Sequence, residues 1–152
     1  MKKAIYILII IAAALSNLAK AQDSTIFSKG EVGKNTSNYT GTIWLNELNQ
    51  PDSVFNFGIA QAIYASGSRL DWHIHPGGQI LLITEGTGYY QEKGKAGRIV
   101  HKGDVIKCPP GVAHWHAAAP NSPFGYLAIS PAQKGRTVWL QKVTDEEYKS
   151  IK

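Results

Sequence analysis

The chain has 152 residues, of which 43% are hydrophobic, and this length and composition suit one globular domain with a sizeable core. The net charge of +5 comes mostly from residues 1–21, which hold three of the 16 Lys and Arg residues and none of the 11 Asp and Glu residues, so the remainder carries +2. Without a Lys/Arg block or a second cysteine beside Cys108, the sequence excludes a nucleic-acid footprint, an internal disulfide and a thiolate zinc site.

Residues 1–21 have the pattern of a secretory signal peptide. Two lysines precede an apolar run over residues 4–15, and the segment ends in Ala-Lys-Ala, which supplies the small residues of a cleavage site. The run is shorter than the roughly 20 residues of a membrane-spanning helix. We therefore expect an exported, periplasmic or secreted protein that begins at Gln22 and has no membrane association after cleavage. Polar residues near the end of the segment leave an uncleaved N-terminal anchor as the alternative.

The rest of the chain predicts an all-β fold, either an antiparallel barrel or a sandwich. Residues 22–41 are polar and rich in turn-forming types, and we expect an N-terminal arm with little regular structure. Over residues 42–143, short runs rich in β-branched and aromatic residues are separated by turn sequences, as in all-β domains. The expected strands are 42–48, 54–65, 69–75, 79–85, 88–92, 98–101, 104–108, 115–118, 124–130 and 137–143.

Residues 144–152 are expected to form a short C-terminal helix. Thr144 followed by Glu147 makes a capping box, and Asp145 and Glu146 place negative charge at the positive end of the helix dipole. Such a short helix gains most of its stability from tertiary packing. We expect it to pack on the outside of the barrel.

Four of the five histidines form two His-x-His pairs, His73/His75 and His114/His116. Residues two apart on a strand point to the same face of a sheet, so both rings of a pair can enter the barrel interior. A Pro-Gly-Gly turn then returns Gln79 on the neighbouring strand, where it faces the same interior. Imidazole and carboxamide groups gathered in this way indicate a metal site.

Other polar or aromatic residues near the pairs are expected to be structural. His101 lies beside a Lys-Gly turn and should be solvated. Trp72 and Trp115 alternate with the histidines, so they should point to the opposite face of the sheet and pack there. Cys108 is expected to be a small buried residue.

These residues resemble both signature motifs of the cupin family. The first motif, G-x5-H-x-H-x3,4-E-x6-G, is matched by Gly67, His73, His75 and Gly86, with Gln79 in place of the glutamate. The second, G-x5-P-x-G-x2-H-x3-N, is matched by Gly103, Pro109, Gly111 and His114, with Ala118 in place of the asparagine. The resemblance implies a cupin barrel (double-stranded β-helix, or jelly roll) over residues 42–143. It also implies one divalent metal ion, held by His73, His75, Gln79 and His114.

The substitution of Gln79 for a glutamate changes the electrostatics of the implied metal site. Three neutral imidazoles and a neutral carboxamide leave the full charge of a dication uncompensated, which favours anionic ligands and lowers the pKa of a bound hydroxyl. Nitrogen and oxygen ligands without a thiolate favour Mn(II) or Fe(II), with Ni or Zn as alternatives.

A finer resemblance covers residues 70–116, which look like the small bacterial cupins that include manganese-dependent hydroxynitrile lyases, also called (R)-mandelonitrile lyases. It implies the same four ligands and makes His116 an acid/base candidate, with a structural role as its alternative. The expected reaction cleaves a cyanohydrin, a small-molecule substrate, into an aldehyde and cyanide, and Ala60 and Ala62 leave room for an aryl group. The same site allows two other interpretations, a Fe- or Mn-dependent dioxygenase and a noncatalytic metal-dependent binding module.

Assembly is expected to follow other cupins of this size, which are commonly homodimers. The arm and the first strand, from Thr42, are placed to pair across an interface and to cover an exposed sheet edge.

Overall fold

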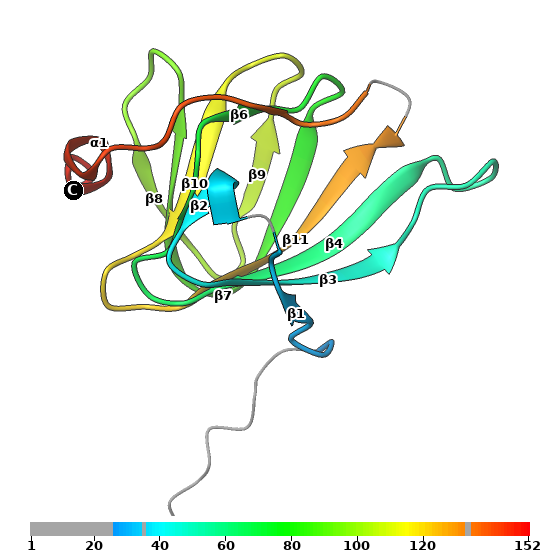
Figure 1. Ribbon diagram of the computed structural model, residues 1–152, viewed down its shortest axis with the longest axis horizontal. Coiled ribbons are helices and arrows are strands. Elements are labelled where there is room, and N and C mark those ends of the chain that lie inside the picture. The colour runs from blue at the N-terminus through cyan, green and yellow to red at the C-terminus, as the bar shows by residue number, and fades with distance from the viewer. Residues whose placement is uncertain (1–25, 35, 133–134) are drawn as a thin grey trace, which may run out of the picture.

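A computed structural model describes residues 26–34, 36–132 and 135–152, and the described chain is a strongly curled antiparallel sheet (Figure 1). The expected leader, residues 1–21, lies outside the described residues. In the described part, no helix has the length and apolar character needed to cross a membrane. The strands are β1 (Glu31–Val32), β2 (Tyr39–Thr40), β3 (Ile43–Asn49), β4 (Phe57–Tyr64), β5 (Arg69–Leu70), β6 (His73–Ile74), β7 (Gln79–Glu92), β8 (Arg98–His101), β9 (Val105–Cys108), β10 (His114–Ala118), β11 (Phe124–Pro131) and β12 (Val138–Trp139). A 3-10 helix, η1 (Thr36–Asn38), and an α-helix, α1 (Asp145–Lys149), complete the described elements.

The sheet closes on itself around the long strand β7. The hydrogen-bonded order is β1-β3-β4-β11-β7-β10-β5-β2, while β8 and β9 add to β7 and the pair β6-β12 adds to β10. The first half of β7 pairs with β11 and β9, and its second half pairs with β10 and β8. Because one strand belongs to two sheets that face each other, the interior is enclosed on both sides. The expected all-β barrel with a short C-terminal helix is confirmed.

Several expected strands differ from the observed ones: the strand expected over 137–143 is reduced to β12, and the one expected over 54–65 begins only at Phe57. The strand predicted over 69–75 is broken into β5 and β6, because the amides of Asp71 and Trp72 donate to Asn38 and Gln141 in neighbouring segments. The two strands predicted over 79–85 and 88–92 form the single strand β7. Gly86 permits this, since it adopts a φ of 68° and a Cβ there would lie 1.8 Å from the Pro123 carbonyl oxygen.

The N-terminal arm is more ordered than expected. It forms β1, which pairs with β3 of its own chain, and β2, which pairs with β5. The Tyr39 hydroxyl donates to the Gly33 carbonyl at 2.6 Å and ties the segment between these strands. The arm thus crosses the rim of the barrel and partly covers the β3 edge within the subunit.

Two separate clusters of buried side chains hold the fold together. One lies inside the barrel, and the other lies between β10 and α1. The second cluster contains Trp72 and Trp115, which confirms that these residues pack on the face opposite the histidines. Helix α1 begins with the expected capping box, and its Tyr148 hydroxyl donates to the Ala118 carbonyl at 2.7 Å. Cys108 is buried, as predicted.

Candidate metal centre

His73 and His114 form the centre of the site because their strands place them directly opposite each other. They are register partners in the β6–β10 pair, with ring centroids 4.4 Å apart. The Nδ1 atom of His73 lies 2.8 Å from the Asp71 carbonyl, and that of His114 lies 2.9 Å from the Val112 carbonyl. A carbonyl oxygen only accepts hydrogen bonds, so each Nδ1 carries the proton and each Nε2 keeps a lone pair. Both rings are therefore held in the tautomer that binds a metal through Nε2.

His75 and Gln79 approach the same centre from either side of the turn over residues 76–78. The His75 Nδ1 contacts the Thr137 hydroxyl at 3.2 Å, and the ring centroid is 5.1 Å from that of His73. The Gln79 Nε2 donates to the Ser130 hydroxyl at 3.1 Å, which turns its Oε1 away as a free acceptor. Burial and nearby His114 lower the pKa of His75 to about 4, so its imidazole is neutral and able to bind a metal.

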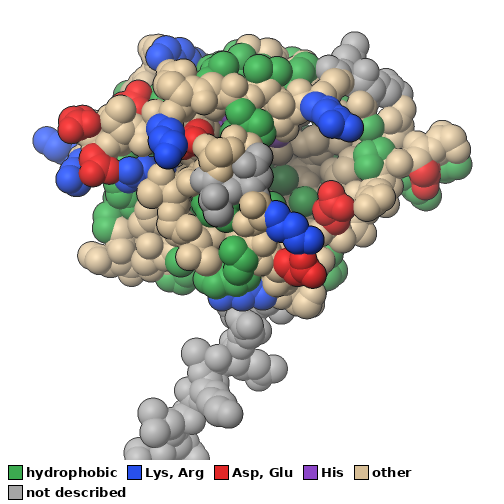
Figure 2. Space-filling view, viewed as in Figure 1, with side chains coloured by type: hydrophobic (Ala, Val, Ile, Leu, Met, Phe, Trp, Pro, Cys, Tyr) green, Lys and Arg blue, Asp and Glu red, His purple; other side chains and the backbone are tan. Residues whose placement is uncertain are grey.

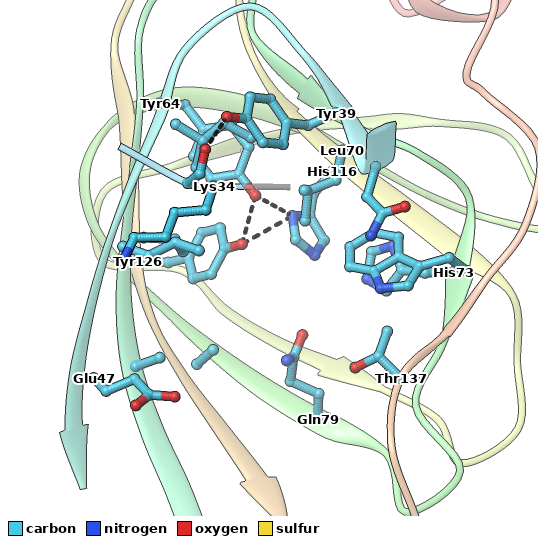
Figure 3. A pocket seen from close by; sticks show the side chains of 18 of the residues that line it. Lys34, Tyr39, Glu47, Tyr64, Leu70, His73, Gln79, His116, Tyr126 and Thr137 are labelled. Carbon is cyan, nitrogen blue, oxygen red and sulfur yellow. Dashed lines mark hydrogen bonds between the residues drawn. The ribbon is translucent and has the colours of Figure 1, made fainter. Parts of the chain in front are cut away.

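His116 joins the centre from β10, two residues after His114. Its Nδ1 lies 3.2 Å from both the Tyr64 and the Tyr126 hydroxyls, and these hydroxyls lie 2.6 Å from each other (Figure 3). Ligand-capable nitrogens of His73, His114 and His116 lie within 4.8 Å of one another. The sequence made His116 an acid/base candidate with a structural role as its alternative, and the structure places it in the same buried cluster as two expected ligands.

The unsatisfied polar atoms test whether this cluster fits a metal ion. The Nε2 atoms of His114 and His116 and the Oε1 of Gln79 are buried and have no hydrogen-bond partner among the described residues. A buried polar atom without a hydrogen bond or a bound ion lowers the stability of the fold. Burial also lowers the pKa of His73, His114 and His116, which favours neutral imidazoles. The three-histidine cluster is therefore compatible with a divalent metal ion.

A cavity of about 540 Å³ opens from the cluster, within the range of small-molecule sites. Its walls are mostly apolar and include Ala60, Ala62, Ala128 and Trp139. The N-terminal arm contributes side chains to its rim. A second hollow of about 1080 Å³ shares His75 and Gln79 with the first, and both side chains are only half-buried, so the centre is reached from solvent. The molecule is visibly hollowed on the face shown in Figure 2.

Several residues of the site were not found from the sequence. Tyr64 lies on the same face of β4 as the two alanines, and Tyr126 and Ser130 share the inward face of β11, so strand alternation could have indicated them. Thr137 began the strand expected over 137–143, but only Val138–Trp139 forms a strand there, so alternation did not place its side chain. His101 is exposed and contacts the Thr87 hydroxyl outside the cavity, as expected of a solvated histidine.

Comparison with known proteins places this geometry in a family. The Cupin domain family matches residues 61–130. An "(R)-mandelonitrile lyase" of Granulicella tundricola is 42% identical over 113 residues, which cover 73% of this chain and 86% of that protein. A cupin-like protein of Thermotoga maritima superposes with a TM-score of 0.79 at 43% identity, covering 84% of this chain and 97% of the other. A cupin 2 conserved barrel domain protein of Rhodopseudomonas palustris gives 0.63 at 19% identity, covering 77% and 78% of the two chains, and supports the fold alone. The chain belongs to the cupin family.

Proposed function

We propose that this protein is a metal-dependent lyase that cleaves cyanohydrins into an aldehyde and cyanide. The observation that carries the proposal is the set of buried atoms without partners in the described chain, the Nε2 atoms of His114 and His116 and the Oε1 of Gln79, beside an apolar cavity. The similarity to an "(R)-mandelonitrile lyase" supports the reaction class.

The cofactor we propose is one divalent ion, Mn(II) or Fe(II), with Ni or Zn as alternatives. The free Nε2 and Oε1 atoms of four residues form a nitrogen and oxygen donor set without thiolate. The ion would be held by His73, His75, Gln79 and His114. When bound, such an ion supplies a Lewis acid that lowers the pKa of a substrate hydroxyl. The neutral ligands would leave the charge of the dication uncompensated, which favours the binding of anionic ligands.

The residues around the cluster would position the substrate for this cleavage. The O–H bond of the cyanohydrin breaks and its electron pair completes the carbonyl, while the C–CN pair leaves with cyanide and the proton ends on hydrogen cyanide. His116 is the proposed catalytic residue, because a nitrogen of its ring lies within 4.8 Å of nitrogens of His73 and His114, beside the reacting atoms. The alanines of β4 and β11 leave space for an aryl group on the opposite wall.

A direct test uses protein purified without chelators, analysed for bound elements and then assayed with racemic mandelonitrile. We expect about one divalent metal per chain, with benzaldehyde and cyanide released in equal amounts and without oxygen uptake. Removal of the metal by a chelator should abolish the reaction, and its return should restore it. Oxygen consumption without cyanide release would instead favour the dioxygenase reading. Tight binding of cyanohydrins without turnover would favour the binding module.

We also propose that the protein acts outside the cytoplasm as a homodimer. The basic and apolar residues 1–21 support export. Because β1 pairs with β3 of its own chain, part of the sheet edge expected at the interface is covered within the subunit. Mass spectrometry of the mature N-terminus and light scattering at tens of micromolar test these two points, and an intact leader or a monomer would contradict them.

A further inference from the structure

The four histidines of the site differ in what holds their Nδ1 atoms. His73 and His114 face backbone carbonyls, which can only accept, so their Nδ1 atoms carry the protons. His116 faces two tyrosine hydroxyls, each 3.2 Å from its Nδ1, and a hydroxyl can donate as well as accept. The partner of Nδ1 determines which form Nε2 takes. The chemistry of the His116 Nε2 therefore follows from the hydrogens of the two tyrosines.

Only one tautomer of a neutral His116 uses both phenolic hydrogens. The hydroxyls of Tyr64 and Tyr126 are 2.6 Å apart, so one donates to the other. The second then has one hydrogen left, and the only further acceptor in contact within the described chain is the His116 Nδ1. If Nδ1 carried a proton, that hydrogen would remain buried without an acceptor, which is unfavourable. Burial raises the pKa of both phenols, so neither loses its hydrogen.

We propose that Tyr64 and Tyr126 hold His116 with its proton on Nε2, so that this ring donates a hydrogen bond to an anionic atom of a bound ligand and does not coordinate the metal. The His116 Nε2 is buried and has no partner among the described residues. One ring nitrogen of His116 lies within 4.8 Å of nitrogens of His73 and His114. An N–H at this place makes an anion site beside the cluster. The inference rests on the proposed function for the identity of the anion, which would be the departing cyanide or the substrate oxygen.

The tautomer assigns His116 a narrower role than a general acid/base. A ring that presents N–H at Nε2 cannot accept the substrate proton at that atom, and it can stabilise negative charge by donation. Tyr64 and Tyr126 are positioning residues, since they act through His116. Each hydroxyl lies within reach of Nδ1, so either tyrosine alone retains a donor for it.

Nitrogen NMR of zinc-loaded protein labelled in its histidines tests the tautomer without any assay of activity. We expect the ring proton on Nδ1 in His73 and His114, and on Nε2 in His116. Tyr64→Phe and Tyr126→Phe should each preserve the His116 tautomer, and the double variant should lose the preference. Tyr90→Phe is the matched control, because it removes a partly buried tyrosine hydroxyl that contacts Glu92 and Cys108 instead of His116. A His116 ring with an unprotonated Nε2 in the wild-type protein would overturn the proposal.

Azide binding to the metal-loaded protein tests the anion site. His116→Ala should weaken azide about 10- to 100-fold, the usual weight of a hydrogen bond to a charged group. His116→Gln should recover part of this affinity, because its amide N–H can reach the position of Nε2, and the double tyrosine variant should fall between. Equal weakening by His116→Ala and His116→Gln would contradict donation. An Nε2–H without mandelonitrile cleavage would reject the lyase alone, whereas cleavage with an unprotonated Nε2 would reject only this inference.

Discussion

The two walls of the cavity are built on different principles. On the histidine wall, formed by β6 and β10, each polar ring is fixed by a second partner such as a carbonyl or a hydroxyl. On the alanine wall, formed by β4 and β11, register pairs Ala62 with Tyr126 and Ala60 with Ala128, and small side chains leave the space open. We therefore propose that the histidine wall determines the chemistry and that the alanine wall determines the size of the ligand. Variants of the two walls should then have separate effects.

Of the variants on either wall, His114→Ala should have the largest effect on metal content and turnover. The change removes a proposed ligand whose Nε2 is free and whose Nδ1 is held by a carbonyl, and the three remaining proposed ligands should bind the ion much more weakly. We expect metal content below about a tenth of wild type, with loss of all turnover, by elemental analysis after gel filtration. His101→Ala, an exposed histidine elsewhere on the barrel, is the control and should keep its metal. Full metal content in His114→Ala would show that the ligand assignment is wrong.

His116→Ala should separate metal binding from chemistry on the same wall. The variant keeps the proposed ligands and loses only the group that we propose to face the reacting atoms. We expect wild-type metal content with kcat lowered about 10²–10⁴-fold, the usual weight of a proton-handling or oxyanion-binding group. Steady-state kinetics with mandelonitrile, at matched metal occupancy, measure the effect. Unchanged turnover would reduce His116 to a packing residue, and loss of metal would make it a ligand.

Ala60→Leu tests the opposite wall. Ala60 lines the cavity and is not fully buried, so a larger side chain there projects into the ligand space and need not disturb the core. We expect kcat/KM for mandelonitrile to fall about 10- to 200-fold, while the cyanohydrin of acetaldehyde is cleaved nearly as before. Metal content should be unchanged. If both substrates lost activity equally, the alanine wall would not determine ligand size.

The same comparison explains what could be predicted from the sequence. The histidine wall was predictable, because His-x-His spacing fixes which side chains share a face, and the resemblance to the cupin motifs implied that His114 joins His73. The alanine wall was half predictable, since Ala60 and Ala62 were found but Tyr64, in the same alternation, was not. Thr137 and the break in the strand predicted over 69–75 depend on hydrogen bonds between segments far apart in sequence, and local pattern carries no information about those.

Thr137→Val should weaken metal binding less than the loss of a proposed ligand does. The change keeps the size of the side chain but removes the hydroxyl that lies 3.2 Å from the His75 Nδ1. Loss of such an orienting partner typically weakens metal affinity about 10- to 100-fold. Competition with a fluorescent chelator gives the dissociation constant. Thr137→Ser should restore wild-type affinity, because it returns the hydroxyl, and equal weakening in both variants would point to packing.

Gln79→Glu is the smallest change, because it alters charge and leaves shape alone. The amide Nε2 of Gln79 donates to the Ser130 hydroxyl, and with a carboxylate at this position the same hydroxyl can donate instead, so the side chain keeps its place. A carboxylate offsets one charge of a dication and is the better ligand for a hard ion. We therefore expect tighter metal binding together with cyanide inhibition weakened roughly 3- to 10-fold, since a unit charge at short range contributes about 1 kcal/mol even in water.

The control for Gln79→Glu changes charge at the cavity rim. Glu47 lines the cavity and is exposed, so Glu47→Gln shifts the net charge by the same amount in the opposite sense without touching the cluster. Solvent screening should keep its effect on cyanide inhibition below the effect of Gln79→Glu. Comparable shifts of opposite sign would show that the overall field of the cavity governs anion binding. Unchanged inhibition in Gln79→Glu would show that neutrality is not what the glutamine contributes, and its role would then be to direct Oε1 into the centre.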